Sequence, residues 1–265
     1  MTELLTILGV SVLVTAVGMA ATAAVAWRLN RVNVVDVTWG LALAAVAAVD
    51  AVLGGPTSWL LFAVVGTWAI RLSLHMARRS AGRGEDPRYE AMLGGTLHEV
   101  GMARAVRKVF LTQGLAVCLV ALPLHAPVVI GTSWGPAMVL GIVLALVGLL
   151  LEAISDAQLA AYKRDPDREP VMDRGLWAWT RHPNYFGDAL FWVGVWMAGG
   201  LASGWLAAAL TFPSPLAMTW FLAFVTGARL LEKTMMQRPG YPEYAARTSM
   251  FVPLPPRRGP RQHRP

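Results

Sequence analysis

The 265-residue sequence has very little cysteine and little charge. Its one cysteine, Cys118, excludes a disulfide framework and any metal site built from several cysteines. No second histidine lies near His182 at a metal-ligand spacing, so we expect no metal site there. Charged residues make up only 15% of the chain, whereas soluble proteins have about 25%. With 55% hydrophobic residues, the chain is not expected to be a soluble domain.

The sequence contains several long apolar runs. Several reach the roughly 18 to 20 residues that a helix needs to cross about 30 Å of hydrocarbon. We predict an all-α, polytopic membrane protein with about seven transmembrane helices. They lie near residues 4–27, 34–53, 57–76, 109–130, 136–154, 185–201 and 206–231. Three of them contain prolines, and we expect Pro213 and Pro215 to break or kink the last one.

The basic residues indicate an orientation in the membrane. Lysine and arginine gather after the first, third and fifth runs and at the C-terminus, whereas the connections near 54–57, 131–135 and 202–204 have none. The positive-inside rule then places the N-terminus outside and the C-terminus in the cytoplasm, which requires an odd number of spans. The net charge of +7 therefore indicates contact with membrane lipids, and we expect no nucleic-acid partner.

The chain is expected to form one membrane domain. No internal repeat is visible, and we predict a single domain over residues 1–252 followed by a basic Pro/Arg-rich tail over 253–265. The first apolar run is not preceded by positive charge and is too long for the core of a signal peptide. We therefore expect it to remain in the mature protein.

The most informative polar stretch is Arg-His-Pro-Asn-Tyr-Phe-Gly-Asp at residues 181–188. It follows a basic loop and leads directly into an apolar run, where a membrane helix meets water. Pro183 fits the first turn of a helix, whose free N–H groups favour an anion. Gly187 allows close approach of a ligand or of another helix. Polar groups at this depth indicate a functional site, and capping of the helix entrance is the plainer alternative.

Two further polar segments are expected on the cytoplasmic side. Glu152 and Asp156 are four residues apart and share one helix face. Either they are solvated or paired with arginines, or they bind the ribose or amide of a ligand. The aromatic and charged segment 232–247 follows the last span. It either folds back over the cytoplasmic mouth or anchors the chain at the interface.

Asp36 lies near the cytoplasmic entrance of the second span. An ionised carboxylate there is costly unless it is paired. It is either a structural partner of Arg28, Arg31 or Arg71, or a protonated acid that donates a proton or a hydrogen bond to a substrate. Asp50, near the opposite end of the same span, is interpreted as an interface residue.

Several of these segments resemble a known family. The motifs at residues 35–40, 85–89, 181–188 and 232–247 are similar to those of the bacterial branch of the steroid 5α-reductase-like membrane proteins. The resemblance covers most of the chain. It implies a seven-helix membrane fold in which the cytoplasmic half encloses NADPH and the membrane half admits a hydrophobic, lipid-like enone. The implied reaction is hydride transfer to the β-carbon with protonation at the α-carbon.

The resemblance also implies site residues. Glu152 and Asp156 align with an Asn and an Asp of the reductases, and Lys163 stands where an Arg is usual. Asn184, Tyr185 and Asp188 would contact the nicotinamide and ribose side of the cofactor. The full set of expected cofactor-binding residues is Glu152, Asp156, Lys163, Arg181, His182, Asn184, Tyr185, Asp188, Glu232, Tyr241 and Arg247. The steroid enzymes' Gln-Glu pair is absent, and Asp36 is the nearest candidate for a catalytic acid.

Two other functions stay open. The Arg-His-Pro-x-Tyr block and a glutamate in the tail also occur in isoprenylcysteine carboxyl methyltransferases and phospholipid methyltransferases, which use S-adenosylmethionine. Those proteins usually have fewer spans and two adjacent glutamates, whereas only Glu232 is found here. A non-catalytic lipid-binding protein is the second alternative. Neither the substrate nor the oligomeric state follows from the sequence.

Overall fold

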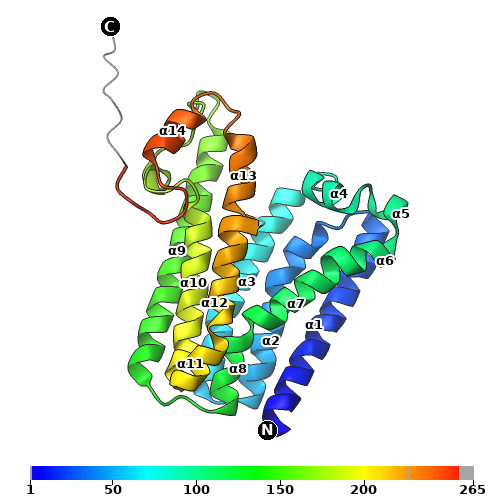
Figure 1. The fold of residues 1–265 in the computed structure, drawn as a ribbon, viewed down its shortest axis with the longest axis vertical. Coiled ribbons are helices and arrows are strands. Elements are labelled where there is room, and N and C mark those ends of the chain that lie inside the picture. Colours follow the sequence, from blue (N-terminus) through cyan, green and yellow to red (C-terminus); the bar gives the residue numbers. More distant parts are fainter. Residues whose placement is uncertain (1, 226, 257–265) are drawn as a thin grey trace. The chain divides into compact units, whose positions relative to one another are not determined.

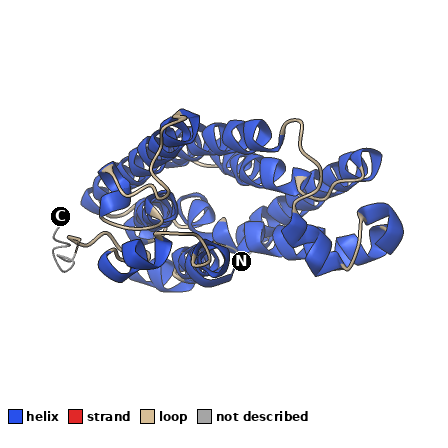
Figure 2. Cartoon of the chain, turned by 90° about the horizontal axis from the view of Figure 1, so that it is seen from above, coloured by secondary structure: helices blue, strands red, loops and turns tan. Residues whose placement is uncertain are grey.

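The structure is a computed structural model that describes residues 2–225 and 227–256. In this part of the chain the regular elements are helices, and the one pairing of β type is an isolated bridge between Thr180 and Ser249 (Figure 1, Figure 2). The prediction of an all-α protein is therefore confirmed. Residues 257–265, most of the predicted basic tail, lie outside the described residues.

Packing divides the chain into two compact units, each made from two stretches of sequence. The first unit comprises Met1–Leu140 and Val195–Ser214, and the second comprises Gly141–Gly194 and Pro215–Pro265. The range predicted as a single membrane domain thus contains parts of both units. All the predicted cofactor-binding residues belong to the second unit, whereas Asp36 belongs to the first.

The first unit is a bundle of apolar helices. Its long helices are α1 (Thr2–Leu29), α2 (Val34–Leu53) and α3 (Pro56–Ser80), and α2 packs against both of the others (Figure 1). Pro56 occupies the first turn of α3, where its missing N–H leaves no intrahelical bond unmade. The side chains of Leu43 and Trp68 are fully buried between these helices, which places the core there.

The rest of the first unit consists of shorter, interrupted helices. They are α4 (Pro87–Leu93), α5 (Leu97–Val100), α6 (Met102–Ala105), the π-helix η1 (Val106–Phe110), α7 (Leu111–Val120), α8 (Leu122–Val129), the 3-10 helix η3 (Leu201–Ser203) and α11 (Trp205–Thr211). The chain bends by 42° between α7 and α8. Pro123 explains the break, because proline lacks an N–H and its ring clashes with the preceding turn.

The second unit contains the polar block. It is built from most of α9 (Gly135–Arg164), the 3-10 helix η2 (Gly175–Ala178), most of α10 (Pro183–Gly199), most of α12 (Pro213–Trp220), the π-helix η4 (Phe221–Val225), α13 (Ala228–Met235) and α14 (Tyr241–Arg247). Helix α11 ends at Thr211 and α12 begins at Pro213, so the interruption predicted for the last apolar run is confirmed.

Helices α9 and α10 pack backbone to backbone through glycines. A Cβ atom added to Gly148 would lie 2.4 Å from the backbone nitrogen of Phe191, and one added to Gly187 would lie 2.6 Å from that of Glu152. At Gly194 the corresponding distance, to the nitrogen of Ala145, is 2.3 Å. Gly187 therefore serves the contact with another helix, one of the two roles predicted for it.

This packing makes a first testable prediction. Gly148→Ala is expected to lower the free energy of unfolding by about 1–3 kcal/mol, because the new methyl group meets backbone that cannot move without shifting a helix. The matched control is Gly18→Ala in α1, where no atom lies within 4 Å of the added carbon and stability should hold or rise. Thermal unfolding of the protein in detergent measures both. Equal effects would contradict the tight α9–α10 contact.

Fewer helices than predicted qualify as membrane spans. Among the described residues, five are long and apolar enough, namely Thr2–Leu29, Val34–Leu53, Pro56–Ser80, Gly135–Arg164 and Trp205–Met235. The bent α7–α8 segment makes six if it counts as one span. The remaining predicted span falls on α10, which has only 17 residues. A multi-pass membrane protein is confirmed, while the predicted orientation, which needs an odd number of spans, stays a prediction.

Candidate functional site

The polar block at residues 181–188 lies in the second unit, where the chain passes from η2 into α10. The C-terminal segment after α14 holds this entrance in place. The backbone nitrogen of Arg181 donates to the carbonyl oxygen of Ser249 at 2.9 Å. The hydroxyl of Thr180, a fully buried residue, donates to the carbonyl oxygen of Phe251 at 2.9 Å. The segment that carries the block is therefore fixed against the C-terminal part of the unit.

Every side-chain nitrogen of Arg181 is engaged. Its Nε and Nη2 atoms donate to the two carboxylate oxygens of Glu232 at 2.9 and 2.8 Å. Its Nη1 atom donates to the carbonyl oxygens of Ala245 at 2.9 Å and Thr248 at 2.5 Å. The planar guanidinium suits this bidentate contact. Arg181 thus connects the start of α10 to α13 and to the end of α14.

Glu232 accepts two further hydrogen bonds. His182 Nε2 lies 2.9 Å from its Oε1 atom, and Tyr241 donates its hydroxyl to the same atom at 2.8 Å. Because an ionised carboxylate only accepts, Nε2 of His182 carries a hydrogen. Burial, reinforced by the hydrogen bond to Glu232, raises the pKa of Tyr241 well above its ordinary value. Its hydroxyl therefore remains protonated and remains a donor.

These four residues, Arg181, His182, Glu232 and Tyr241, form what we call the Glu232 cluster. The side chains of Arg181 and Glu232 are only 11% and 12% exposed, so most of the charge is removed from water. All four were predicted to hold a cofactor, and the structure brings them together. Their hydrogen-bonding atoms are directed at one another, which makes them residues that position the C-terminal segment beside α10. Direct contact with a cofactor stays a prediction.

The two acid-containing pairs predicted from the sequence also come together. The side-chain amide of Asn184 on α10 donates to a carboxylate oxygen of Asp156 on α9 at 3.2 Å. One turn deeper on the same two helices, Glu152 and Asp188 are 4% and 6% exposed. The spacing of four residues put each pair on one helix face, and the close α9–α10 packing turns those faces toward each other.

An aromatic pair lies beside this contact. The rings of His182 and Tyr185 are stacked, with centroids 5.6 Å apart and planes within 8° of parallel. Because His182 is also bonded to Glu232, the stack links the Glu232 cluster to the first turn of α10. Tyr185 was predicted to contact the nicotinamide side of a cofactor, and its position next to Asn184 is compatible with that role.

Lys163 and Arg247 lie apart from these groups. Lys163 is two turns beyond Asp156 on α9, about 10 Å along the helix axis, and lines a separate cavity. Arg247, near the end of α14, forms an ion pair with Asp173, and both side chains are partly exposed. The structure therefore does not join these two predicted cofactor residues to the Asn184–Asp156 contact.

Asp36 in the first unit has a partner that the sequence reasoning missed. The hydroxyl of Tyr89 on α4 donates to Asp36 Oδ1 at 2.6 Å, whereas Arg28, Arg31 and Arg71 had been considered. Burial, followed by the effects of the neighbouring Asp36, raises the pKa of Tyr89 well above its ordinary value. The signal was present in the sequence, because Tyr89 belongs to the motif at residues 85–89 that carries part of the family resemblance.

The other residues of that motif cap helices. The carboxylate of Glu85 accepts from the backbone nitrogens of Val32 and Asn33, just before α2. Asp86 is the N-cap of α4 and accepts from the backbone nitrogen of Arg88 at 2.9 Å. The hydrogen bond from the Arg88 side chain lowers the pKa of Asp86. Both acids therefore satisfy N–H groups at helix starts and hold Tyr89 next to Asp36.

The position predicted for Asp50 was wrong. We expected an interface residue, but its side chain is buried, with 1% of its surface exposed. Its Oδ2 atom lies 2.8 Å from Nδ1 of His125 on α8, which is also buried. Its Oδ1 atom has no hydrogen-bond partner among the described residues. The misplacement arose because distance from a helix end in the sequence does not show which helices cover that end.

Comparisons with known proteins support the membrane family. No curated protein and no solved structure matches the chain. One family matches residues 22–248, a range that includes every predicted site residue. This match covers more than half of the chain, and the chain therefore belongs to the family described as "Protein of unknown function (DUF1295)".

Proposed function

We propose that this chain is a membrane-embedded, NADPH-dependent reductase of an activated C=C bond in a lipid-like substrate. The observation that carries the proposal is the hydrogen bond between Asn184 and Asp156. It joins the two residue pairs that the resemblance to the steroid 5α-reductases assigns to the cofactor. The family match itself goes no further than membership of a membrane protein family.

The groups around this hydrogen bond fit the riboside end of a nicotinamide nucleotide. Asn184 donates to one oxygen of Asp156, and a carboxylate has the lone pairs to accept further hydrogen bonds, such as those from ribose hydroxyls or a carboxamide N–H. A carboxylate that binds ribose hydroxyls is a common feature of nucleotide sites. Both residues are half-buried, so a ligand can reach them while bulk water is partly excluded.

Each part of the chain then has a defined role. When bound, NADPH supplies a hydride to the β-carbon of the activated C=C bond, and the α-carbon takes up a proton. Asp156 and Asn184 orient the riboside, and the Glu232 cluster holds the C-terminal segment beside them. Asp36 stays the predicted acid, and the hydroxyl of Tyr89, which it binds, is held in its protonated form.

A second candidate is a methyltransferase that uses S-adenosylmethionine. One observation favours it. The five or six candidate spans are fewer than the seven expected for a reductase, and the related methyltransferases usually have fewer spans. Asp156, Glu152 and Asp188 would also suit the cationic groups of S-adenosylmethionine. Ligand binding must decide between the two enzymes.

Ligand-induced stabilisation provides the test. NADPH at about 100 times its Kd should stabilise the detergent-purified protein by about 2.7 kcal/mol, because a ligand that binds only the folded state shifts unfolding. S-adenosylmethionine should have no effect on the melting temperature. Stabilisation by S-adenosylmethionine alone would contradict the proposed reductase and favour the methyltransferase. Stabilisation by neither ligand would favour a non-catalytic lipid-binding protein.

Variants at the proposed contact make the test specific. Asn184→Ala with Asp188→Ala should abolish the NADPH shift, and Asn184→Ala alone, at a half-buried position, should reduce it without unfolding the protein. The matched control is Gln113→Ala with Glu90→Ala, an amide and an acid of the first unit, and it should keep the full shift. An undiminished shift in both Asn184 variants would remove this contact from the cofactor site.

A further inference from the structure

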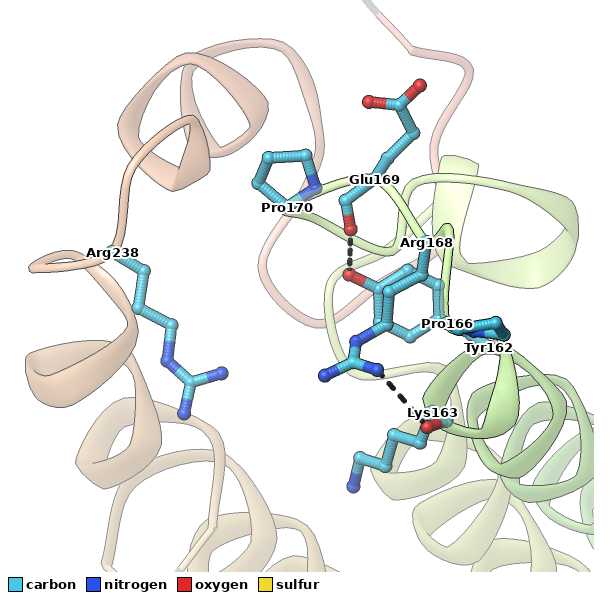
Figure 3. Close-up of a pocket in the computed structure, with 7 residues that line it drawn as sticks. All are labelled: Tyr162, Lys163, Pro166, Arg168, Glu169, Pro170 and Arg238. Atoms are coloured by element: carbon cyan, nitrogen blue, oxygen red, sulfur yellow. Dashed lines mark hydrogen bonds between the residues drawn. The ribbon is translucent and has the colours of Figure 1, made fainter.

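A cavity of about 590 Å³ lies in the second unit, between the loop that follows α9 and the turn that follows α13. Figure 3 shows its lining, with Arg238 on one side and the α9 loop on the other. The lining residues are Tyr162, Lys163, Pro166, Arg168, Glu169, Pro170 and Arg238. Its volume is within the range of about 300–1,000 Å³ that is typical of small-molecule sites.

The charges around this cavity are mainly positive. Lys163, Arg168 and Arg238 contribute three cations against a single carboxylate, that of Glu169. In Figure 3 the carboxylate of Glu169 extends away from the region where the tips of the three cations lie. The hydroxyl of Tyr162 is used by the backbone, because it donates to the carbonyl oxygen of Glu169. The charged side chains whose tips lie in the cavity region are therefore cationic.

The two arginines are held from opposite sides by local structure. Arg168 donates from Nη1 to the carbonyl oxygens of Lys163 at 3.3 Å and Asp165 at 3.2 Å, which leaves Nε and Nη2 for a ligand. Arg238 is held through its backbone in the turn before α14, where its nitrogen donates to Met235 at 2.9 Å. Its guanidinium has no hydrogen bond or ion pair with the described residues. Two arginines with partly or wholly unused donors thus face one cavity.

We propose that this cavity binds a phosphate group, most suitably a dianionic phosphomonoester, held between Arg168 and Arg238 with Lys163 adding a third positive charge. The guanidinium fork matches two phosphate oxygens, and bidentate contacts from both sides would use donors that the protein leaves open. The cavity is larger than a phosphate ion, so the phosphate would be one end of a larger ligand. The inference does not rest on the proposed reductase activity.

Two ligands offer this chemistry. One is a soluble nucleotide with a terminal phosphomonoester, such as NADP⁺, which differs from NAD⁺ by one such group. The other is a lipid headgroup such as that of phosphatidic acid, since basic loops next to a membrane attract anionic lipids. S-adenosylmethionine has no phosphate and would not occupy the cavity.

Calorimetric titration of the full-length protein in uncharged detergent tests the site, with inorganic phosphate and pyrophosphate as probes. Both should bind at low salt and bind more weakly as ionic strength rises. Arg168→Gln with Arg238→Gln should weaken binding at least about fivefold, as expected for two exposed charge contacts. The matched control is Arg107→Gln, an exposed arginine of the first unit, which should change binding less than twofold. No binding by the unaltered protein, or equal affinities for the double variant and the control, would overturn the proposal.

Two more measurements identify the source of the phosphate. Tighter binding of NADP⁺ than of NAD⁺, lost in the Arg168/Arg238 double variant, would assign the cavity to a nucleotide. Retention of the protein on vesicles of phosphatidic acid but not of phosphatidylcholine, lost in the same variant, would assign it to a lipid. Absence of both effects would overturn the proposal that the cavity binds a phosphomonoester. Because the Asn184→Ala variant leaves this cavity intact, phosphate binding and the proposed reductase activity can fail independently.

Discussion

Glu232→Gln is expected to lower the free energy of unfolding by about 3–5 kcal/mol, the usual cost of removing one partner from a buried ion pair. The side chains of Arg181 and Glu232 are 11% and 12% exposed, so water cannot replace the lost charge well. Glutamine would keep the shape, but its NH₂ group would face donors of Arg181, His182 or Tyr241. At least one buried donor would then lose its acceptor.

Thermal unfolding in detergent measures this effect, and Arg247→Gln is the matched control. Arg247 also forms an ion pair in the second unit, with Asp173, but the two side chains are 45% and 34% exposed. An exposed pair contributes at most about 1 kcal/mol, so the control should be nearly neutral. A loss for Glu232→Gln no larger than that for Arg247→Gln would show that the Glu232 cluster does not hold the C-terminal segment.

The parts of the site that the sequence predicted are those set by local geometry. Glu152 and Asp156, and likewise Asn184 and Asp188, are four residues apart, and helical geometry alone places each pair on one face. Proline chemistry similarly predicted the break at Pro213, because the reason for the break is local. Composition was sufficient to predict the class of fold, because apolar runs of this number and length are typical of helices that span a membrane.

The parts that the sequence did not predict depend on contacts between distant segments. Nothing in the local pattern shows that Glu232 binds Arg181, 51 residues away, or that Tyr89 binds Asp36, 53 residues away. Helix ends were also uncertain, because α10 runs from Pro183 to Gly199, just before a 3-10 helix, and so begins and ends two residues earlier than the apolar run predicted at 185–201. Periodicity tells which face of a helix is polar, but not which helix it meets.

His125→Leu is expected to destabilise the first unit by about 4 kcal/mol at pH 7. The substitution removes the hydrogen-bond partner of Asp50, whose side chain is 1% exposed in an apolar helix bundle. A carboxylate without a partner is too costly there, so the variant must fold with a protonated acid. Protonation of an aspartate with the ordinary pKa of about 3.9 costs about 4 kcal/mol at pH 7, at 1.36 kcal/mol for each pH unit.

The same argument predicts unequal effects of the two partners. Asp50→Leu leaves a histidine that is neutral at little cost near pH 7, so it should destabilise less than His125→Leu. The double variant, with two apolar residues facing each other, should be close to neutral, as is often found when a buried ion pair is replaced. Thermal unfolding of the three variants forms a double-mutant cycle, and a nearly neutral double variant implies a coupling energy of at least about 4 kcal/mol.

The order of the two single-variant effects distinguishes this explanation from simple loss of packing. A penalty as large for Asp50→Leu as for His125→Leu would mean that the His125–Asp50 contact fills space without carrying charge.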